Sequence, residues 1–585
     1  MSLSLMFIPL LLKIASRGLK QSALFIVSVA RFGNFWHYKC NARWIDTWGP
    51  HHQTLEPQNS LITGPITTML VHHYLEYYGR NMPDLHCLSS EGATYSYGEV
   101  NARANRLAHG LLSLGVDAGE RVGILGENDL AHLLLYMATS KIGAVSVSLN
   151  YRLAPAELAY IIDDANCRAL LALDGMGDTL GELRSQVDSN ISVISQGFEN
   201  TLILDTWSAN FPATNPEREI SPNSAFVQLY TSGTTGNPKG VVSSHFNMLS
   251  LAAMNTAATP HRPSPGYSTI LCAPMFHIGG TGSIVYNVSH GMHTLMHRVF
   301  DPARIVDDIE THGVNNIFMV PAMIMAVLQL PNIEQRDFSK LKQVFYGASP
   351  ISESVLRRAL DIFQCDFIQM YGMTETTGTV VNLTADDHRK ALDGRPELLR
   401  SCGRPSVGGK AKVVDSAGAE VPTGDIGEIW LHSDTNMLSY YNLPEATAAN
   451  LTDGWVHTGD AGYMDEEGYL YLKDRMKDMV VSGGENIYPV EVENALAKHE
   501  AVQDVAVIGV PDEKFGEALL AFVVLAEDAS LEAEEMVAFC REHIAGYKIP
   551  RKLEIVEELP RNPSGKILKK ILREPYWADA GRGIG

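Results

Sequence analysis

Residues 230–240 read YTSGTTGNPKG, a run that combines hydroxyl side chains, three glycines and one lysine directly after a plausible strand end. Glycine adopts positive-φ conformations from which anion-binding nests of backbone N–H groups are built, and Gly233 and Gly236 supply this freedom. Lys239 adds a positive charge. The hydroxyl donors of the run are Thr231, Ser232, Thr234 and Thr235. Phosphate is the natural ligand of such a run, but a flexible surface loop rich in serine and glycine has the same composition, and other motifs have to decide between the two.

The end of this loop differs from that of a P-loop nucleotidase. A Walker A loop has the form GxxxxGK[ST], in which a magnesium-ligating Ser or Thr follows the lysine at once. Here Pro238 precedes Lys239 and Gly240 follows it. The sequence therefore excludes the P-loop class.

Composition and charge indicate the size class of the protein and argue against several classes of ligand. At 585 residues the chain is long enough for two or more hydrophobic cores. Its 46 basic and 67 acidic residues give a net charge of −21, which argues against nonspecific binding of nucleic acid. The seven cysteines form no CxxC pair, so we expect a reducing compartment with neither disulfides nor zinc.

The first 44 residues contain basic but no acidic side chains, and Lys20 separates two short apolar runs. These runs are too short to span a membrane. Three interpretations of an N-terminal extension over residues 1–66 stay open: a cleaved transit segment, translation from a start upstream of the natural one, and an anchor that contacts the membrane surface. We expect a cytoplasmic protein, or a mitochondrial matrix protein if the extension is a transit peptide.

The rest of the chain has the texture of an α/β protein. Short β-branched runs alternate with segments of helical period, as in ERVGILGEN followed by HLLLYMATSKIGA, which is typical of βα units on parallel sheets. We predict doubly wound sheets in a large N-terminal domain over residues 67–475. Glycine-punctuated strands after Gly403 predict a β-rich subdomain of it. A small, mobile α+β C-terminal domain is predicted over residues 476–585.

Four more motifs follow the loop along the chain: YGMTET at 371–376, TGD at 458–460, DRMKDMVVSGGENIYPVEVEN at 474–494 and PRNPSGKI at 560–567. In this order they resemble the signatures of the adenylate-forming (AMP-binding) superfamily, which contains acyl-CoA synthetases, peptide-synthetase adenylation domains and beetle luciferases. The resemblance covers residues 69–573. It implies that a carboxylate attacks the α-phosphorus of ATP, releases pyrophosphate and gives an acyl-adenylate, from which a thiol then displaces AMP.

The resemblance also implies the cofactors and their contacts. ATP, Mg²⁺ and CoA as co-substrate are expected, with the loop from Thr231 to Lys239 on the β- and γ-phosphates. In the second motif, Tyr371 and Gly372 would offer a flat surface to adenine, Thr374 would contact the α-phosphate, and Glu375 would bind magnesium.

Other nucleotide contacts are implied elsewhere. Asp460 can accept both ribose hydroxyls, and Arg475 is similarly placed in the family. The segment Gly347, Ala348 and Ser349 resembles one that lines the adenine and acyl sites.

The C-terminal motifs imply a domain that swings between two half-reactions. Lys566 would reach the carboxylate and the α-phosphate during adenylation, about a hinge at Lys477. The face for the thiol step would then carry Ser482, Gly483, Gly484 and Glu485, whose small members leave room for pantetheine.

The segment APMFHIGG carries His277 where amino-acid-activating domains have an aspartate, which disfavours amino acids and implies an aromatic gate between carboxylate and thiol. The candidate pocket walls are apolar or small, with no charged residue among them: Phe276, Val320, Met323, Gly347 and Met373. We expect an acyl-CoA ligase for medium- or long-chain fatty acids. An aryl or short acid, and a fatty-acyl-AMP ligase that loads a carrier protein, stay open as alternatives, and the sequence does not fix the oligomeric state.

Overall fold

The computed structural model describes residues 24–32, 35–43, 69–187, 190–231, 237–349, 351–475, 478–482, 485–512, 515–561 and 567–577. The chain divides into two compact units, Met1–Gly64 and Pro65–Gly585. In the first unit, β1 (Leu24–Phe32) pairs antiparallel with β2 (Phe35–Arg43). Everything below concerns the second unit.

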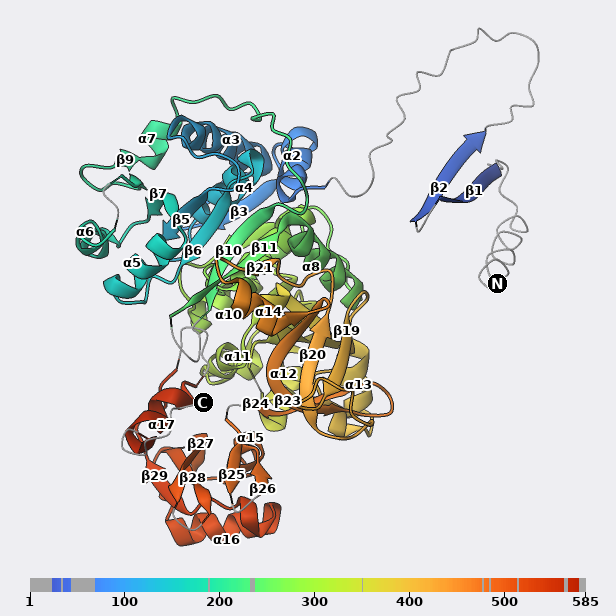
Figure 1. The fold of residues 1–585 in the computed structure, drawn as a ribbon, viewed down its shortest axis with the longest axis vertical. Coiled ribbons are helices and arrows are strands. Elements are labelled where there is room, and N and C mark those ends of the chain that lie inside the picture. The colour runs from blue at the N-terminus through green and yellow to red at the C-terminus, as the bar shows by residue number, and fades with distance from the viewer. Residues whose placement is uncertain are drawn as a thin grey trace. The chain divides into compact units, whose positions relative to one another are not determined.

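The first large sheet has eight strands (Figure 1). In spatial order they are β21 (Ser439–Tyr440), β11 (Lys239–Ser244), β10 (Ala225–Thr231), β6 (Val145–Leu149), β5 (Arg121–Leu125), β7 (Cys167–Ala172), β8 (Ser192–Ser195) and β9 (Leu202–Ile203). The strands from β10 to β9 run parallel, whereas β11 is antiparallel to both of its neighbours. The hairpin of β10 and β11, which carries the glycine-rich loop, therefore lies next to the edge strand β21.

The second large sheet has nine strands. In spatial order they are β18 (Arg404–Pro405), β17 (Gly378–Leu383), β16 (Asp366–Met373), β15 (Gln343–Gly347), β14 (Asn316–Met319), β12 (Ser268–Leu271), β13 (His293–Met296), β3 (His86–Ser90) and β4 (Ala93–Ser96). Strands β16 to β3 are parallel, and antiparallel strands close both edges. The carboxyl ends of β15 and β16 carry the Gly347 and Tyr371 segments to one edge of this sheet.

A layer of helices separates the two sheets and forms the largest core with their facing sides. Its members are α2 (Val71–Asn81), α3 (Tyr97–Ser113), α4 (Leu130–Ile142), α8 (His245–Ala258) and α9 (Ile278–Ser289). Helix α4 is buried at every position, as expected for a helix that is apolar all round. The Asp129 carboxylate caps its first turn, and Gly143 ends it in the left-handed region with φ 77°.

Further helices cover the outer faces of both sheets. On the first sheet, α5 (Pro155–Asp164) and α6 (Gly177–Leu183) enclose a second core, and α7 (Leu204–Ser208) packs on α3. On the second sheet the covering helices are α10 (Pro302–His312), α11 (Pro321–Leu328), α12 (Glu353–Phe363) and α13 (Ala385–Leu392). This arrangement confirms the predicted doubly wound sheets.

A five-stranded sheet forms the predicted β-rich subdomain. Its strands are β19 (Lys410–Val414), β20 (Gly427–His432), β22 (Leu451–Thr452), β23 (Trp455–Met464) and β24 (Leu470–Arg475), with α14 (Pro444–Asn450) before β22.

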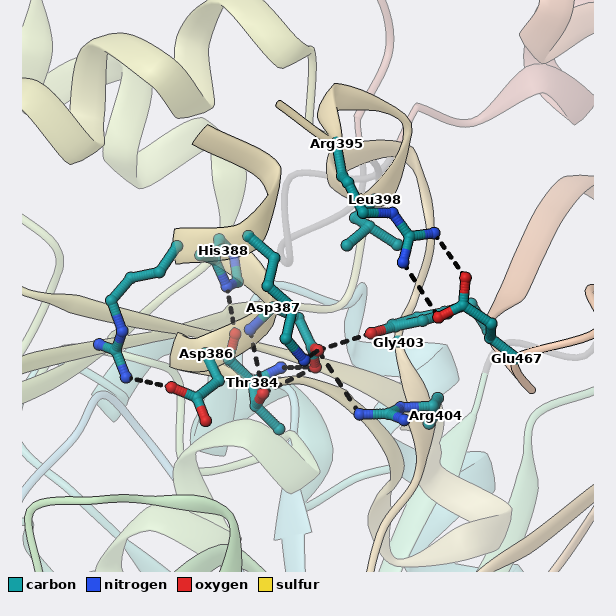
Figure 2. Close-up of polar contacts among 12 residues, drawn as sticks. Thr384, Asp386, Asp387, His388, Arg395, Leu398, Gly403, Arg404 and Glu467 are labelled. Atoms are coloured by element: carbon teal, nitrogen blue, oxygen red, sulfur yellow. Dashed lines mark hydrogen bonds and ion pairs between the residues drawn. The ribbon is translucent and has the colours of Figure 1, made fainter. Parts of the chain in front are cut away.

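Asp387 of α13 joins this subdomain to the second large sheet (Figure 2). Its buried carboxylate accepts hydrogen bonds of 2.7 Å from the hydroxyls of Thr384 and Tyr469, the latter just before β24. The same carboxylate lies 3.5 Å from the Arg404 guanidinium of β18. One side chain thus ties three segments that are distant in sequence.

The C-terminal part is a separate α+β sheet, as predicted. Its elements are β25 (Val480–Ser482), β26 (Glu485–Ile487), α15 (Pro489–Leu496), β27 (Val502–Asp512), β28 (Gly516–Leu525), α16 (Ala533–His543), β29 (Lys552–Ile555) and α17 (Lys569–Trp577). It has its own cores on both faces. The residue boundaries given to the domains from sequence stay predictions. Among the described helices, none combines the length and apolar character needed to cross a bilayer.

Candidate active site

The glycine-rich loop connects two antiparallel strands. Thr231 at the end of β10 pairs with Lys239 at the start of β11, so hydrogen-bonded strands hold both ends of the loop. A P-loop instead leads from a strand into a helix. The loop residues Ser232, Gly233, Thr234, Thr235 and Gly236 lie outside the described residues. Their phosphate contacts stay predictions.

Tyr440 connects Lys239 with Glu375. Strand β21 pairs with β11, which places the Lys239 ammonium 5.0 Å from the centre of the Tyr440 ring, a cation–π contact. The Tyr440 hydroxyl donates a 2.7 Å hydrogen bond to Glu375 Oε1. The Glu375 backbone carbonyl accepts from the N–H of Met437 at 2.8 Å. Burial, then the Glu375 charge, raises the pKa of the Tyr440 hydroxyl.

Two glycines shape the backbone beside Glu375. A Cβ on Gly372 would lie 1.8 Å from the carbonyl oxygen of Gly378, and a Cβ on Gly347 would lie 2.1 Å from that of Met370. Both positions therefore require glycine, because backbone cannot yield as a side chain does. After Gly347 the chain turns through Ala348, which has φ 69°, to the half-buried Ser349. The predicted α-phosphate contact Thr374 begins a 3₁₀ turn, Thr374–Thr376, with Glu375 in its middle.

Tyr371 contacts the predicted ribose residue. Its hydroxyl donates a 2.8 Å hydrogen bond to Asp460 Oδ2, which links β16 of the second sheet to β23 of the β-rich subdomain. The backbone N–H of Asp460 donates to the Thr458 hydroxyl at 3.0 Å, and Asp460 pairs with Arg475 of β24 in register. The Arg475 side chain is not among the described features. Burial, followed by Asp460, raises the pKa of Tyr371 well above its usual value.

His277 occupies the N-cap position of α9, where its side chain makes no capping hydrogen bond. Burial, followed by the charge of Arg152, lowers its pKa to about 4, so the ring is neutral at neutral pH. Its Nε2 is buried and has no hydrogen-bond partner in the described part of the chain. The ring lies 4.6 Å from that of Phe276, which in turn contacts Tyr151 edge to face.

A cavity of about 310 Å³ lies beside this segment. Val320 and Met323 line it, as expected, whereas Phe276, Gly347 and Met373 are not among its lining residues. Two arginines, Arg152 and Arg298, also line it, so this cavity is not walled by apolar residues alone, and the five predicted acyl-pocket walls stay a prediction. Arg152 follows β6 of the first sheet and Arg298 follows β13 of the second, so the cavity is lined by loops from both large sheets.

The remaining predicted residues belong to the C-terminal part. Ser482 on β25 is half-buried and pairs with Glu485 on β26, which places both at one hairpin. The Glu485 side chain, and all of Lys477, Gly483, Gly484 and Lys566, lie outside the described residues. Their roles stay predictions.

Sequence reasoning missed Tyr440, Arg152 and Asn128. Asn128 is buried and holds the segment before His277: its Nδ2 donates to the carbonyl of Ala273 at 3.0 Å, and its Oδ1 accepts from the N–H of Met275 at 2.8 Å. Asn in a GEN turn after a buried strand was an available signal. Nothing in the sequence near Tyr440 singles out its hydroxyl.

Comparison with known proteins identifies the family to which the chain belongs. Residues 75–441 match the AMP-binding enzyme family, and residues 491–566 match the AMP-binding enzyme C-terminal domain. The chain is 35% identical to a fatty acid–acyl-carrier-protein ligase of Streptomyces coeruleorubidus, over 87% of this chain and 96% of that protein. It is 34% identical to a long-chain-fatty-acid–CoA ligase of Mycobacterium tuberculosis, over 83% of this chain and 93% of that protein.

A solved structure agrees with these relatives. The o-succinylbenzoate–CoA synthetase of Bacillus subtilis, in complex with its acyl-adenylate intermediate, superposes with a TM-score of 0.75 at 29% identity, over 85% of this chain and 97% of that one. The resemblance read from the five motifs is thereby confirmed. The chain belongs to the AMP-binding, adenylate-forming family and is an acid–thiol ligase that uses ATP and CoA or a carrier thiol.

Proposed function

We propose that this enzyme converts a medium- or long-chain fatty acid to its acyl-adenylate and then to the acyl-CoA thioester. The observation that carries the proposal is the link made by Tyr440, which joins the cation after the glycine-rich loop to a buried carboxylate. A triphosphate needs positive charge on its leaving group, and Lys239 supplies it at a fixed place.

Glu375 has the chemistry of a magnesium ligand. It is 7% exposed, and within the described residues its carboxylate has the Tyr440 hydrogen bond but no ion pair with Lys, Arg or His. A buried carboxylate without a cation is costly, and magnesium prefers oxygen ligands of this kind. When bound, the metal would neutralise charge on the phosphates. Tyr440 would hold the carboxylate in place.

The other residues take roles around the nucleotide. Asp460 would accept the ribose hydroxyls, and the hydrogen bond that Tyr371 donates to it would hold in place the ring whose face adenine would contact. Neutral His277 would form the aromatic gate between the carboxylate and the approaching thiol. Lys566, on the C-terminal part, would complete the adenylation site after rotation about Lys477.

Fatty acids are favoured over other acids by the mainly apolar lining around Val320 and Met323 and by the fatty-acid relatives. Loading of a carrier protein is the second candidate, because the Streptomyces relative is named for that reaction. Activation of aryl acids is a third, because the Bacillus structure carries such an adenylate.

Release of pyrophosphate from ATP separates these candidates. The purified enzyme is offered fatty acids of 6 to 16 carbons, benzoate, cinnamate and succinylbenzoate, each without thiol, with CoA, or with a phosphopantetheinylated carrier protein. We expect release with fatty acids, and a thioester with CoA. A thioester formed on the carrier protein alone, or release with aryl acids alone, would replace the proposal by the corresponding alternative.

A cytoplasmic location is proposed on composition alone. Fractionation of cells that express the full chain, compared with a chain lacking residues 1–65, tests it. Recovery of the full chain with mitochondria, but not of the shortened one, would establish the transit interpretation instead.

A further inference from the structure

A row of buried polar side chains crosses the second sheet on the face that it turns toward α8 and α9. The row follows the strand register, with one residue each from β13, β12, β14 and β15: Thr294, Thr269, Asn316 and Gln343. Two residues further along the same strands, the same face is apolar: Met296 and Leu271 belong to the core formed with α8 and α9, Phe318 lies against Gly279 of α9, and Phe345 lies against Tyr286. The row therefore lies at the end of the strands opposite the active site.

Three polar atoms beside this row lack hydrogen-bond partners among the described residues. They are Gln343 Nε2, the Tyr286 hydroxyl of α9 and Asn255 Oδ1 of α8. Their residues are 0%, 5% and 8% exposed. Buried polar groups without partners are rare because each one costs the free energy of its lost hydration. Three such atoms at one end of a core indicate a polar ligand that would make the missing hydrogen bonds.

Contacts of these residues and their neighbours place all three in the layer where α8 and α9 pack on the sheet. The Tyr286 ring lies 6.2 Å from that of Phe345, which shares a strand face with Gln343. Ala252, one turn before Asn255 on α8, packs in one cluster with Tyr286. The amide oxygen of Gln343 accepts a hydrogen bond from the Thr259 hydroxyl directly after α8.

Two elements connect this region with the active site. His277 is the residue just before α9, and Tyr286 lies nine residues after it, which is about 13 Å at the rise of an α-helix. On β15, Gly347 and Gln343 share one face and are separated by about 13 Å at the rise of a strand. Glycines at 279, 280 and 282 let Phe318, the Pro274 backbone and Leu251 pack closely against the first turns of α9. An extended acid of about ten carbons spans this distance.

We propose that Tyr286, Gln343 and Asn255 form a subsite for a neutral hydroxyl group at the far end of the acid. The inference rests on the proposed function, since it extends the acyl site of that reaction. A hydroxyl oxygen accepts two hydrogen bonds and donates one, which matches two donors, Tyr286 and Gln343, and one acceptor, Asn255.

A carboxylate is a poorer occupant than a hydroxyl. None of the described side chains at this subsite is Lys or Arg, and the neighbouring His290 ring, 4.6 Å from Tyr286, has its pKa lowered by burial. A buried anion would have no counter-charge there.

The test compares acids that differ only at the far carbon. Pyrophosphate release without CoA is measured for octanoic, decanoic and dodecanoic acids and for their ω-hydroxy and α,ω-dicarboxylic forms. Variants are Tyr286→Phe and Gln343→Leu. The matched control is Tyr346→Phe, which removes a buried tyrosine hydroxyl from the opposite face of the same strand, where it bonds His388 at 2.9 Å.

For the unchanged enzyme we expect kcat/KM for 10-hydroxydecanoic acid to exceed that for decanoic acid by about tenfold, a size typical of hydrogen bonds in a built site. Each variant should bring the ratio close to one, mainly through KM for the hydroxy acid, whereas Tyr346→Phe should leave the ratio unchanged. Thermal unfolding of each variant shows whether it is folded.

Several outcomes overturn the inference. No preference for the hydroxy acid, or a preference that both variants retain, means that a structural water alone completes the three atoms. A preference for the dicarboxylic acid excludes the neutral group. If the enzyme forms the hydroxyacyl-adenylate but no CoA thioester, the proposed function is wrong and the subsite is retained. If it forms decanoyl-CoA without any preference for the hydroxy acid, the proposed function is retained and the subsite is wrong. Release with none of the acids overturns both.

Discussion

Replacing Tyr440 by phenylalanine tests whether the tyrosine holds the Glu375 carboxylate. The substitution retains the ring and with it the contact with Lys239, and removes the 2.7 Å hydrogen bond to Oε1. A hydrogen bond to a charged group contributes about 1.5 to 3 kcal/mol, more than one between neutral groups, and both residues are under one tenth exposed. We expect kcat/KM for adenylation to fall by about 30-fold, the equivalent of about 2 kcal/mol.

The assay is pyrophosphate release in a double-mutant cycle with Glu375→Gln, at limiting and saturating magnesium. If the hydroxyl acts through the carboxylate, Tyr440→Phe should have little further effect once Glu375 is changed, and the coupling should be about 2 kcal/mol. Tyr441→Phe is the control, because its ring contacts Arg121 and not the carboxylate. Equal losses from Tyr440→Phe in both backgrounds would refute the reasoning.

Three other predictions concern stability, acid sensitivity and the two half-reactions. Asp387→Asn should lower the free energy of unfolding by about 2 to 4 kcal/mol at pH 7. Burial raises the pKa of Asp387, but hydrogen bonds led by that from Thr384 lower it overall. The stability that the Asp387 carboxylate contributes should therefore be present above its unfolded pKa of about 4 and be lost as pH falls through the folded pKa, which urea unfolding at pH 3 to 7 measures. As pH falls from 6.5 to 4, the unfolded chain protonates His277 but the folded chain, in which the buried ring has a pKa of about 4, does not, so the free energy of unfolding falls. His277→Asn should reduce this fall by up to about 3 kcal/mol. The same fall in the variant, measured by urea unfolding across this pH range, would contradict this. Lys566→Ala should abolish adenylate formation and spare thioester formation from supplied acyl-adenylate, and equal loss of both, measured separately, would contradict the swinging domain.

Patterns local in sequence predicted the architecture well. Alternation of β-branched runs with helical segments gave β5, α4 and β6 near their observed positions, because burial on both faces of a parallel strand leaves a direct trace in composition. The five motifs predicted the family for a similar reason, because glycine and hydroxyl residues at fixed spacing indicate where the backbone turns tightly and where hydrogen-bond donors lie.

Contacts between distant segments could not be predicted in this way. Tyr440 and Glu375 are 65 positions apart and meet because β21 joins the edge of the other sheet, a pairing of two residues that leaves no periodic signal. Arg152 and Arg298 reach one cavity through separate loops. The polar row has the same origin, since each strand contributes one polar residue and only the register aligns them.

The antiparallel pairing of Thr231 with Lys239 has a consequence for engineering the enzyme. Because β-sheet hydrogen bonds hold Thr231 and Lys239, the segment between them can be exchanged for that of a relative, or lengthened, while the Lys239 ammonium keeps its position at the start of β11. Grafted loops should therefore tune how the nucleotide enters and leaves without disturbing the scaffold.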